Sequence, residues 1–234
     1  MVSIMSSFRQ KASIVTFIGP VGVGKSTQMG LARDFLETKG FRVVVTFIKS
    51  SHALTYLIEK PLFALGIYEK VVYGGNIRTY LRRDLFRRLL PLWCFLDVVS
   101  IAAKFMLTVY IPLTIGYTVF VEEGLAMTLL TYNRIFPFFF ETSPQKLPVV
   151  TSLLAWTKSR KHVNVILDAS DDELILRRSR REYRRNELPD YIRMQRQWMN
   201  SLDTKDSVFI NTSGKTISEV QWKIVQLLED LHTR

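Results

Sequence analysis

The sequence is poor in the residues that bind metals and cross-link chains. It contains one cysteine, Cys94, and three histidines, His52, His162 and His232, which are isolated and do not have the spacing of metal ligands. A single cysteine excludes a disulfide within the chain, so we expect an intracellular, cytoplasmic protein. No Ser-His-Asp or Cys-His arrangement is apparent, which leaves hydrolysis by a nucleophilic side chain without support.

The sequence also lacks features that would divide the chain or place it in a membrane. No repeat, low-complexity tract or Pro/Gly/Ser-rich linker is apparent, so we expect one domain over residues 1–234, and residues 1–11 contain no long apolar segment of a secretory signal. Segment 89–121 is apolar apart from Asp97 and Lys104, but Pro112 and Gly116 divide it before the roughly 20 residues of a spanning helix. We interpret it as a buried helix and a core strand. A membrane-spanning segment and attachment to a membrane surface are the alternatives.

Acidic residues are outnumbered by basic ones, and the formal net charge is +11. The excess is local, because two clusters hold eleven arginines, as many as the whole net charge. We therefore favour clusters that face a triphosphate over a general coat for nucleic acid, with nucleic acid or an anionic membrane as the alternative partner. The clusters are Arg78, Arg82, Arg83, Arg87 and Arg88, and Arg177, Arg178, Arg180, Arg181, Arg184 and Arg185.

Short apolar segments alternate with helical patterns along the chain. This alternation predicts an α/β fold of three layers, in which a five-stranded parallel sheet has helices on both faces. Ligands bind at the carboxyl ends of the strands in such sheets. The segments with the composition of buried strands are 12–18, 42–48, 117–121, 163–167 and 207–210.

A long insert, about residues 50–116, separates the second predicted strand from the third and has mostly helical patterns. Its residues 76–90 alternate Arg with Leu and Phe, which predicts an amphipathic helix that we expect Pro91 to interrupt. Further along, three prolines surround the phenylalanines at 138–140. We interpret these phenylalanines as core or a packed loop, with an exposed contact for a partner or lipid as the alternative.

One motif carries a specific chemical prediction. Residues 19–26, GPVGVGKS, follow the first predicted strand and precede a helical pattern over 27–39. This order is that of a phosphate-binding loop, or P-loop, whose backbone amides and helix N-terminus bind phosphate, and it predicts a P-loop NTPase fold. We expect Lys25 to reach the outer phosphates and the Ser26 hydroxyl to bind Mg²⁺. The predicted nucleotide contacts are Gly19, Gly22, Gly24, Lys25, Ser26 and Thr27.

Acidic residues follow two of the predicted strands. Glu122 follows the third, at a position where Mg²⁺ or its water shell is held beside a phosphate loop, so it is the second metal candidate. Glu123 is the less suitable choice because successive strand residues face opposite ways. Residues 168–173 follow the fourth strand, and we assign them a structural role at a helix N-terminus, with Ser170 or Asp171 as its cap.

The arginine-rich segment, about residues 171–188, is expected to form a helical lid. Arg177, Arg181 and Arg184 share one face of the helix. Their guanidinium groups would bind a triphosphate bidentately and stabilise charge on the transferred phosphoryl group, with a solvated basic face as the alternative. The turn at 211–216 is expected to form one wall of a base pocket.

With these motifs in place, the chain resembles the thymidylate kinases and, more loosely, the wider group of nucleoside-monophosphate kinases. The resemblance is clearest in residues 14–46, which contain GPVGVGKSTQMGLARDFLETKGFRVVV, and in residues 163–231, which contain VILDASDDELILRRSRR. It implies a five-stranded parallel core, a lid that includes Arg177 and Arg181, and ATP-dependent phosphoryl transfer to a nucleoside monophosphate.

The chain departs from the pattern of the thymidylate kinases at four places. Ile18 and Val21 stand where these enzymes usually have acids, and FIKS at 47–50 replaces their Arg-Glu-Pro-Gly. Two glutamates at 122–123 replace Asp-Arg, and Asp-Val at 97–98 stands where an acceptor-contacting Asp-Arg is expected. The resemblance is therefore kept on the donor side of the expected cleft and lost on the acceptor side.

The function predicted from the sequence is a cytoplasmic phosphotransferase that uses ATP and Mg²⁺, with thymidylate as the default acceptor. Its expected catalytic residues are Lys25, Arg177, Arg181 and Arg184, and its metal ligands are Ser26 and Glu122. The alternatives are a nucleotide-binding switch or membrane-associated ATPase without an acceptor, and a kinase for a sugar or lipid-linked acceptor. The expected partners are a nucleotide substrate, a membrane surface and a second copy, but no specific nucleic acid.

Overall fold

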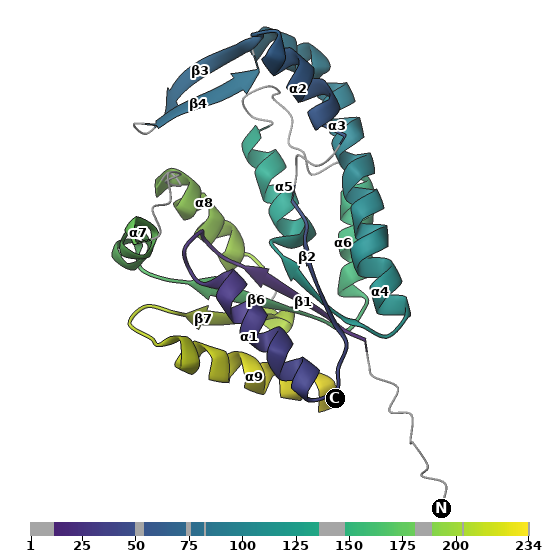
Figure 1. The fold of residues 1–234 in the computed structure, drawn as a ribbon, viewed down its shortest axis with the longest axis vertical. Helices are drawn as coiled ribbons and strands as arrows, with labels where there is room; N and C mark the ends of the chain where they lie inside the picture. The colour runs from purple at the N-terminus through teal and green to yellow at the C-terminus, as the bar shows by residue number, and fades with distance from the viewer. Residues whose placement is uncertain are drawn as a thin grey trace, which may run out of the picture.

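A five-stranded parallel sheet in the order β2-β5-β1-β6-β7 forms the centre of the molecule (Figure 1). The structure is a computed structural model, and it describes residues 12–49, 54–73, 76–81, 83–135, 148–180, 189–202 and 204–233. The predicted fold class is confirmed, and each strand boundary lies within two residues of its prediction. The strands are β1 (Ile14–Ile18), β2 (Val43–Phe47), β5 (Thr118–Glu122), β6 (His162–Asp168) and β7 (Ser207–Asn211).

Helices cover both faces of the sheet and make it the middle of three layers. Because successive strand residues point to opposite faces, Val15 and Phe17 pack against α1 (Lys25–Thr38) and α9 (Ile217–Thr233). Ile14 points the other way, into a core formed with helices α3, α5 and α6. The bounds of these helices are Arg83–Phe105 for α3, Gly124–Ile135 for α5 and Pro148–Lys158 for α6.

The insert between β2 and β5 contains a β-hairpin that the sequence analysis did not predict. The helix α2 (Tyr56–Ala64) leads into β3 (Tyr68–Tyr73), which pairs antiparallel with β4 (Asn76–Leu81). The helix expected over 76–90 is therefore wrong for its first half, because 76–81 alternates Ile, Thr and Leu with other residues and fits the two-residue period of a strand. The expected interruption at Pro91 is also wrong. This proline is exposed within α3, while Leu90 and Trp93 beside it are buried and hold the helix in place.

The helix α3 continues through a π-helical segment, Met106–Tyr110, into α4 (Ile111–Thr114), so Pro112 does not end it. Pro112 lies in the first turn of α4, where a missing N–H is tolerated, and the helical rod ends just before Gly116. Residues Arg88–Thr114 are long and apolar enough to cross a membrane, and 28% of their most apolar window is buried. The expectation of a buried helix therefore holds for one face of the rod, and the core strand after it is β5.

The last part of the chain positions α7 (Asp171–Ser179) and α8 (Pro189–Asn200) at the carboxyl ends of β1 and β6 (Figure 1). Ser170 caps α7 by accepting a hydrogen bond from the Glu173 amide, as predicted for this helix start. The predicted lid extends beyond the described part of α7. Arg181, Arg184 and the phenylalanines at 138–140 lie outside the described residues.

Candidate nucleotide-binding site

The loop between β1 and α1 has a backbone that only glycine allows at its first position. A Cβ on Gly19 would lie 2.1 Å from the Leu167 carbonyl oxygen of β6, which is closer than any side chain can approach. Gly22 and Gly24 have φ angles of 91° and 102°, in the left-handed region that glycine adopts without strain. The glycines of the motif therefore fold the loop tightly over the end of the sheet, where its amides precede the N-terminus of α1.

Lys25 is the first residue of α1, and its side chain turns back into the loop. It is 6% exposed, and its Nζ atom donates hydrogen bonds to the carbonyl oxygens of Gly19, at 2.7 Å, and Pro20, at 3.2 Å. An ammonium group that is this well buried needs partners of opposite polarity. Phosphate oxygens at the loop would supply such partners, so the position of Lys25 fits the predicted role.

The two predicted metal ligands lie together. The Ser26 hydroxyl donates a hydrogen bond to Oε1 of Glu122, the last residue of β5, over 3.3 Å. Glu123 follows the end of β5 with a φ angle of 67°, and its carboxylate lies 3.4 Å from the Lys49 ammonium. A hydroxyl and a carboxylate are hard oxygen ligands of the kind that Mg²⁺ takes together with substrate phosphates and water.

No cluster of three or more His, Cys, Asp or Glu that could hold a metal occurs among the residues that the structure describes. In nucleotide sites Mg²⁺ takes one or two protein ligands, because phosphates and waters complete its shell. The donor set at Ser26 and Glu122 therefore fits Mg²⁺ that arrives with a nucleotide.

Arg178 packs against the P-loop and donates a hydrogen bond to it, a contact that was not predicted from the sequence. Its side chain is buried, and its Nε atom donates to the Val21 carbonyl oxygen at 2.9 Å. A Cβ on Gly22 would lie 3.2 Å from Arg178 Cγ, so the arginine stem packs on the loop. Leu174 and Arg178, four residues apart, form the buried side of α7. Their spacing is the signal that could have identified Arg178 as the loop contact.

Arg177, a predicted catalytic residue, joins three elements at the edge of the site. Its guanidinium donates to the Glu173 carboxylate at 3.1 Å, to the Thr212 carbonyl oxygen at 2.8 Å and to the Thr212 hydroxyl at 3.0 Å. It also reaches the Val23 carbonyl oxygen in the P-loop at 3.4 Å. Arg177 thus fixes the turn at 211–216, the predicted base-pocket wall, against the P-loop. Of the arginines predicted on this face, the structure describes the side chain of Arg177.

A second arginine that the sequence analysis missed, Arg196 of α8, fixes the start of α7. It pairs with Asp168 at 2.9 Å and with Asp171 at 2.7 Å, and it donates to the Ala169 carbonyl oxygen at 2.6 Å. The structural role predicted for residues 168–173 agrees with these contacts. An open pocket of about 560 Å³ lies beside them, at the carboxyl ends of β6 and β7.

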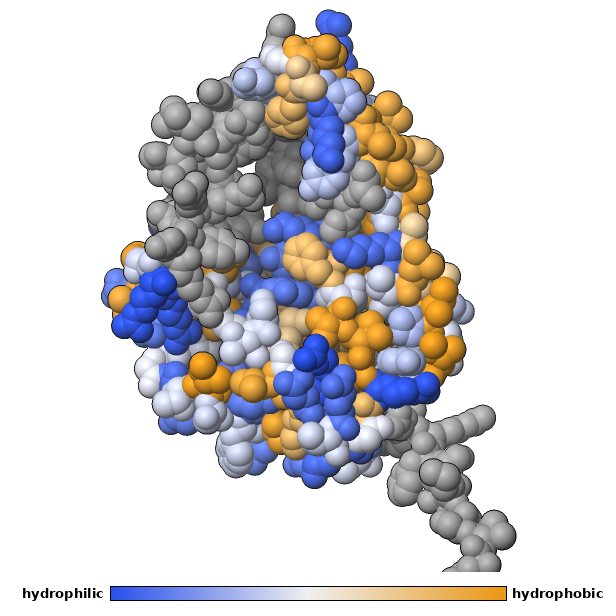
Figure 2. Space-filling view, in the orientation of Figure 1, coloured by the Kyte–Doolittle hydropathy of each residue, from blue (hydrophilic) through white to orange (hydrophobic). Residues whose placement is uncertain are grey.

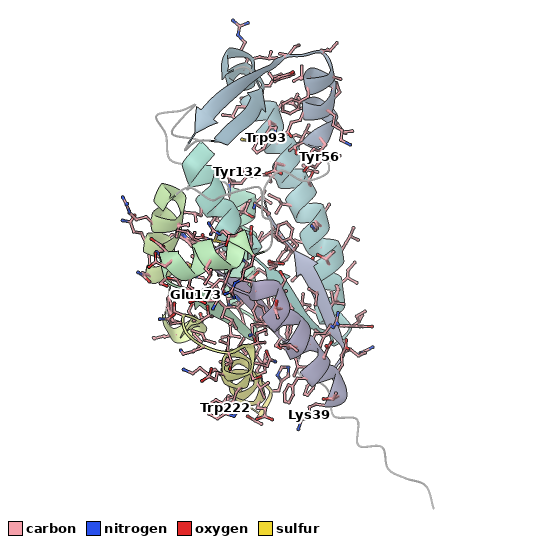
Figure 3. All side chains as sticks on the ribbon, turned by 60° about the vertical axis from the view of Figure 1, so that its left-hand side comes forward. Lys39, Tyr56, Trp93, Tyr132, Glu173 and Trp222 are labelled. Atoms are coloured by element: carbon pink, nitrogen blue, oxygen red, sulfur yellow. The ribbon has the colours of Figure 1, made fainter. Side chains whose placement is uncertain are left out.

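The position at which the resemblance expects an acceptor contact is enclosed in the core. Asp97 of α3 is 0% exposed, and the Tyr132 hydroxyl of α5 donates a hydrogen bond to its carboxylate. Trp93 packs edge-on against Tyr132 and donates to the Glu59 carboxylate at 2.8 Å (Figure 3). Burial raises the pKa of Tyr132, so its hydroxyl stays protonated and remains a donor. Asp97 therefore contributes to the packing of α3 on α5.

Cys94 lies one turn before Asp97. Burial, with a smaller contribution from Asp97, raises the pKa of its thiol to about 12. A thiol of this pKa is neutral at physiological pH and is therefore a poor nucleophile.

The fold is similar to that of solved thymidylate kinases. The enzyme from Ehrlichia chaffeensis is 17% identical, with a TM-score of 0.51 over 93% of this chain and 99% of that one. The enzyme from Candida albicans is 16% identical, with a TM-score of 0.51 over 94% of each chain. No protein-family model and no curated protein matches the sequence. The chain therefore has a thymidylate kinase-like fold, and at these identities the similarity establishes the fold alone.

Proposed function

We propose that this protein binds ATP with Mg²⁺ at the P-loop and transfers the γ-phosphoryl group to a nucleoside monophosphate. The hydrogen bond between Ser26 and Glu122 is the observation that carries the proposal. This hydrogen bond joins the start of α1 to the end of β5, next to the buried Lys25. A group that can bind phosphate, Lys25, thus adjoins two oxygen ligands that can bind a cation. The thymidylate kinase-like fold supports the same reaction class and makes thymidylate the first acceptor to test.

Each residue of the site has a distinct part in the proposed reaction. The N–H groups of the loop that follows Pro20, together with Lys25, hold the β- and γ-phosphates, while Ser26 and Glu122 hold the metal. The Mg²⁺ ion supplies neutralisation of phosphate charge when it is bound. Arg178 keeps the loop in its binding shape through the Val21 carbonyl. Positioning and fixed charge provide most of the catalysis, because phosphoryl transfer needs little covalent help from the protein.

We further propose that Arg181 and Arg184 act from the lid on the phosphoryl group as it is transferred. Three observations support the placement. The described part of α7 lies against the P-loop through Arg178, it is joined to that loop by Arg177, and the chain continues from there into the arginine-rich segment. Guanidinium groups supplied at this point would meet charge that develops on the phosphoryl oxygens.

A second function is favoured by the burial of Asp97. This carboxylate is enclosed at the position expected to contact an acceptor, and the residues at 47–50 also depart from the pattern of the thymidylate kinases. A nucleotide-dependent switch or ATPase without a nucleotide acceptor would need the donor side alone. Both functions share the P-loop chemistry and differ in whether a second substrate is required.

Release of ADP from Mg-ATP in the presence of single acceptors distinguishes the two functions. The panel includes thymidylate, the other nucleoside monophosphates, nucleosides and a sugar, each compared with a reaction that lacks an acceptor. Acceptor-dependent release that Lys25→Ala abolishes supports the kinase. Equal release with and without every acceptor contradicts the kinase and supports the ATPase.

A further inference from the structure

The rod formed by α3, the π-helical segment and α4 exposes large apolar side chains along one side. Figure 2 shows hydrophobic residues along the edge of the molecule that this rod forms in Figure 1. The exposed fractions reach 64% for Phe95 and 65% for Leu107. We call this surface the apolar ridge, and its main residues are Leu92, Phe95, Val99, Met106, Leu107 and Ile111.

Buried and exposed residues have a regular spacing along the rod. The buried side chains of the rod recur every four residues from Trp93 to Val109, and Leu107 and Ile111 of the ridge have the same spacing. An α-helix has 3.6 residues per turn, so a four-residue repeat would drift around it. The π-helical segment, Met106–Tyr110, takes more residues per turn and reduces the drift over that part of the rod only. The rod thus has buried residues from Trp93 to Val109 and exposed apolar residues from Leu92 to Ile111.

The apolar ridge has cations at its ends and no acidic residue of its own. Residues 85–121 include a single acid, Asp97, and it is buried under Tyr132. Arg88 is exposed near the start of the rod. At the other end Arg42 donates to the Ile115 carbonyl oxygen at 2.6 Å and lies 4.6 Å from the centre of the Tyr117 ring. An apolar band between cations complements a bilayer with acidic headgroups.

These cations argue against a second copy of the chain on the ridge. A two-fold dimer places the same patch on itself. Because both ends of the ridge are basic, either direction of pairing brings cations against cations, which is unfavourable without intervening acids. The rod also cannot leave the protein to span a bilayer, because its other side packs Trp93, Ile101 and Phe105 into the core.

We propose that the apolar ridge docks on the surface of an anionic lipid bilayer, with α3 lying in the plane of the interface. Exposed leucine, phenylalanine, methionine and isoleucine side chains then enter the acyl boundary, while Arg88 and Arg42 meet acidic headgroups. None of the P-loop residues lies on the apolar ridge, so the proposal does not depend on the reaction that the protein catalyses.

Co-sedimentation of the full chain with vesicles tests this proposal. One set of vesicles contains phosphatidylcholine alone, and the other contains equal parts of phosphatidylcholine and phosphatidylglycerol. The ridge variant F95E/L107E is compared with I217E/W222E, which adds the same charges to exposed apolar residues of α9. The variant F95Q/L107Q removes apolar surface without adding charge, and the melting temperature of each variant checks that it is folded.

The wild type is expected to bind the anionic vesicles more strongly than the neutral ones, and less strongly at high salt. Both ridge variants should lose at least about tenfold in partitioning, while I217E/W222E should lose none of it. A wild type that does not bind anionic vesicles, or ridge variants that bind as well as the wild type, would overturn the proposal. A dimer in sedimentation velocity that F95Q/L107Q dissociates, without vesicle binding by the wild type, would assign the ridge to a second copy instead.

Discussion

The two sides of the expected cleft are built in different ways. On the donor side, one continuous segment supplies the loop, Lys25 and Ser26, and Glu122 completes it from a neighbouring strand. On the acceptor side, the insert supplies a hairpin, a long helix and a buried Asp97. The proposed donor side is thus a local motif, in which the loop, Lys25 and Ser26 are neighbours in the sequence. The acceptor side is an assembly of distant segments that departs from the pattern of the thymidylate kinases.

The two sides also differ in what substrate binding requires of them. Phosphate binding needs backbone amides and a few fixed charges, which a short motif can provide. Recognition of an acceptor needs side chains that meet from several elements, and at 97–98 this chain uses its acid for packing. Changes on the donor side should therefore abolish nucleotide chemistry, while changes around Asp97 should alter stability first.

Lys25→Ala should have the largest effect. Removing the buried ammonium takes away the charge that faces the β- and γ-phosphates, so turnover should fall at least about 10³-fold. Because Lys25 also donates to the Gly19 and Pro20 carbonyl oxygens, the free energy of unfolding should fall by about 1–3 kcal/mol, so turnover is compared at a temperature at which urea unfolding shows both proteins to be folded. The matched control is Lys49→Ala, whose lysine pairs with Glu123 on the acceptor side and should cost less than about fivefold.

Glu122→Gln should reduce turnover about 10²-fold and raise the Mg²⁺ concentration needed for half-maximal activity, because an amide is a weaker Mg²⁺ ligand than a carboxylate. Glu123→Gln changes the adjacent residue in the same way but faces Lys49, so it should leave the Mg²⁺ requirement unchanged. Titrations of activity with Mg²⁺ measure both variants. Equal effects of the two substitutions would remove Glu122 from the metal site.

Tyr132→Phe should destabilise the protein without weakening ATP binding. It removes the donor to the buried Asp97 carboxylate, which should lower the free energy of unfolding by about 1.5–3 kcal/mol. Tyr110→Phe removes a hydroxyl from a tyrosine that packs on Trp156 and should change it by less than about 0.5 kcal/mol. Urea unfolding measures both values. A Tyr132→Phe protein of wild-type stability and impaired acceptor use would place Tyr132 at the substrate instead.

Acidification should have a small effect on stability, through His162 and His232. Burial lowers the pKa of both side chains in the native state below the ordinary value of 6.5. Between the lowered pKa and 6.5, the native state therefore binds fewer protons than the unfolded state. Stability is therefore full above about pH 6.5 and is lost as the pH falls below it, by at most about 1.4 kcal/mol per pH unit for each histidine.

His232 Nε2 lies 3.1 Å from the Thr118 hydroxyl and 3.3 Å from the Ser13 hydroxyl, and it holds the end of α9 against the sheet. His232→Gln should reduce the slope of unfolding free energy against pH between pH 7 and 5. An unchanged slope would contradict the assignment. Because both histidines lie away from the P-loop, ATP binding should not follow this slope.

The parts of the fold that were predictable from the sequence are those with local causes. The β-branched runs of the five parallel strands and the glycines of the P-loop determine their own conformations, so strand boundaries and the Ser26–Glu122 contact follow from pattern and alternation. Residues 76–81 show the limit of this approach. Their alternation fits a strand as well as one side of a helix, and the pairing with β3 decides between the two.

Contacts that depend on tertiary packing were not predictable in the same way. Arg178 contacts the Val21 carbonyl oxygen because it lies on the buried side of α7. Leu174 lies on the same side, but this side is known only once the helix has been placed against the loop. The exposure of the apolar ridge also could not be read from a segment that is apolar on both sides. Only packing decides which of these sides enters the core.

The claim on which the account depends is that the loop at 19–26 binds a nucleoside triphosphate. Titration calorimetry of the wild type with ATP and Mg²⁺ measures this binding directly, with Lys25→Ala titrated alongside. We expect saturable heat and an increase in melting temperature for the wild type, and neither for the variant. A wild type that shows no heat and no increase in melting temperature with ATP or GTP would contradict the account.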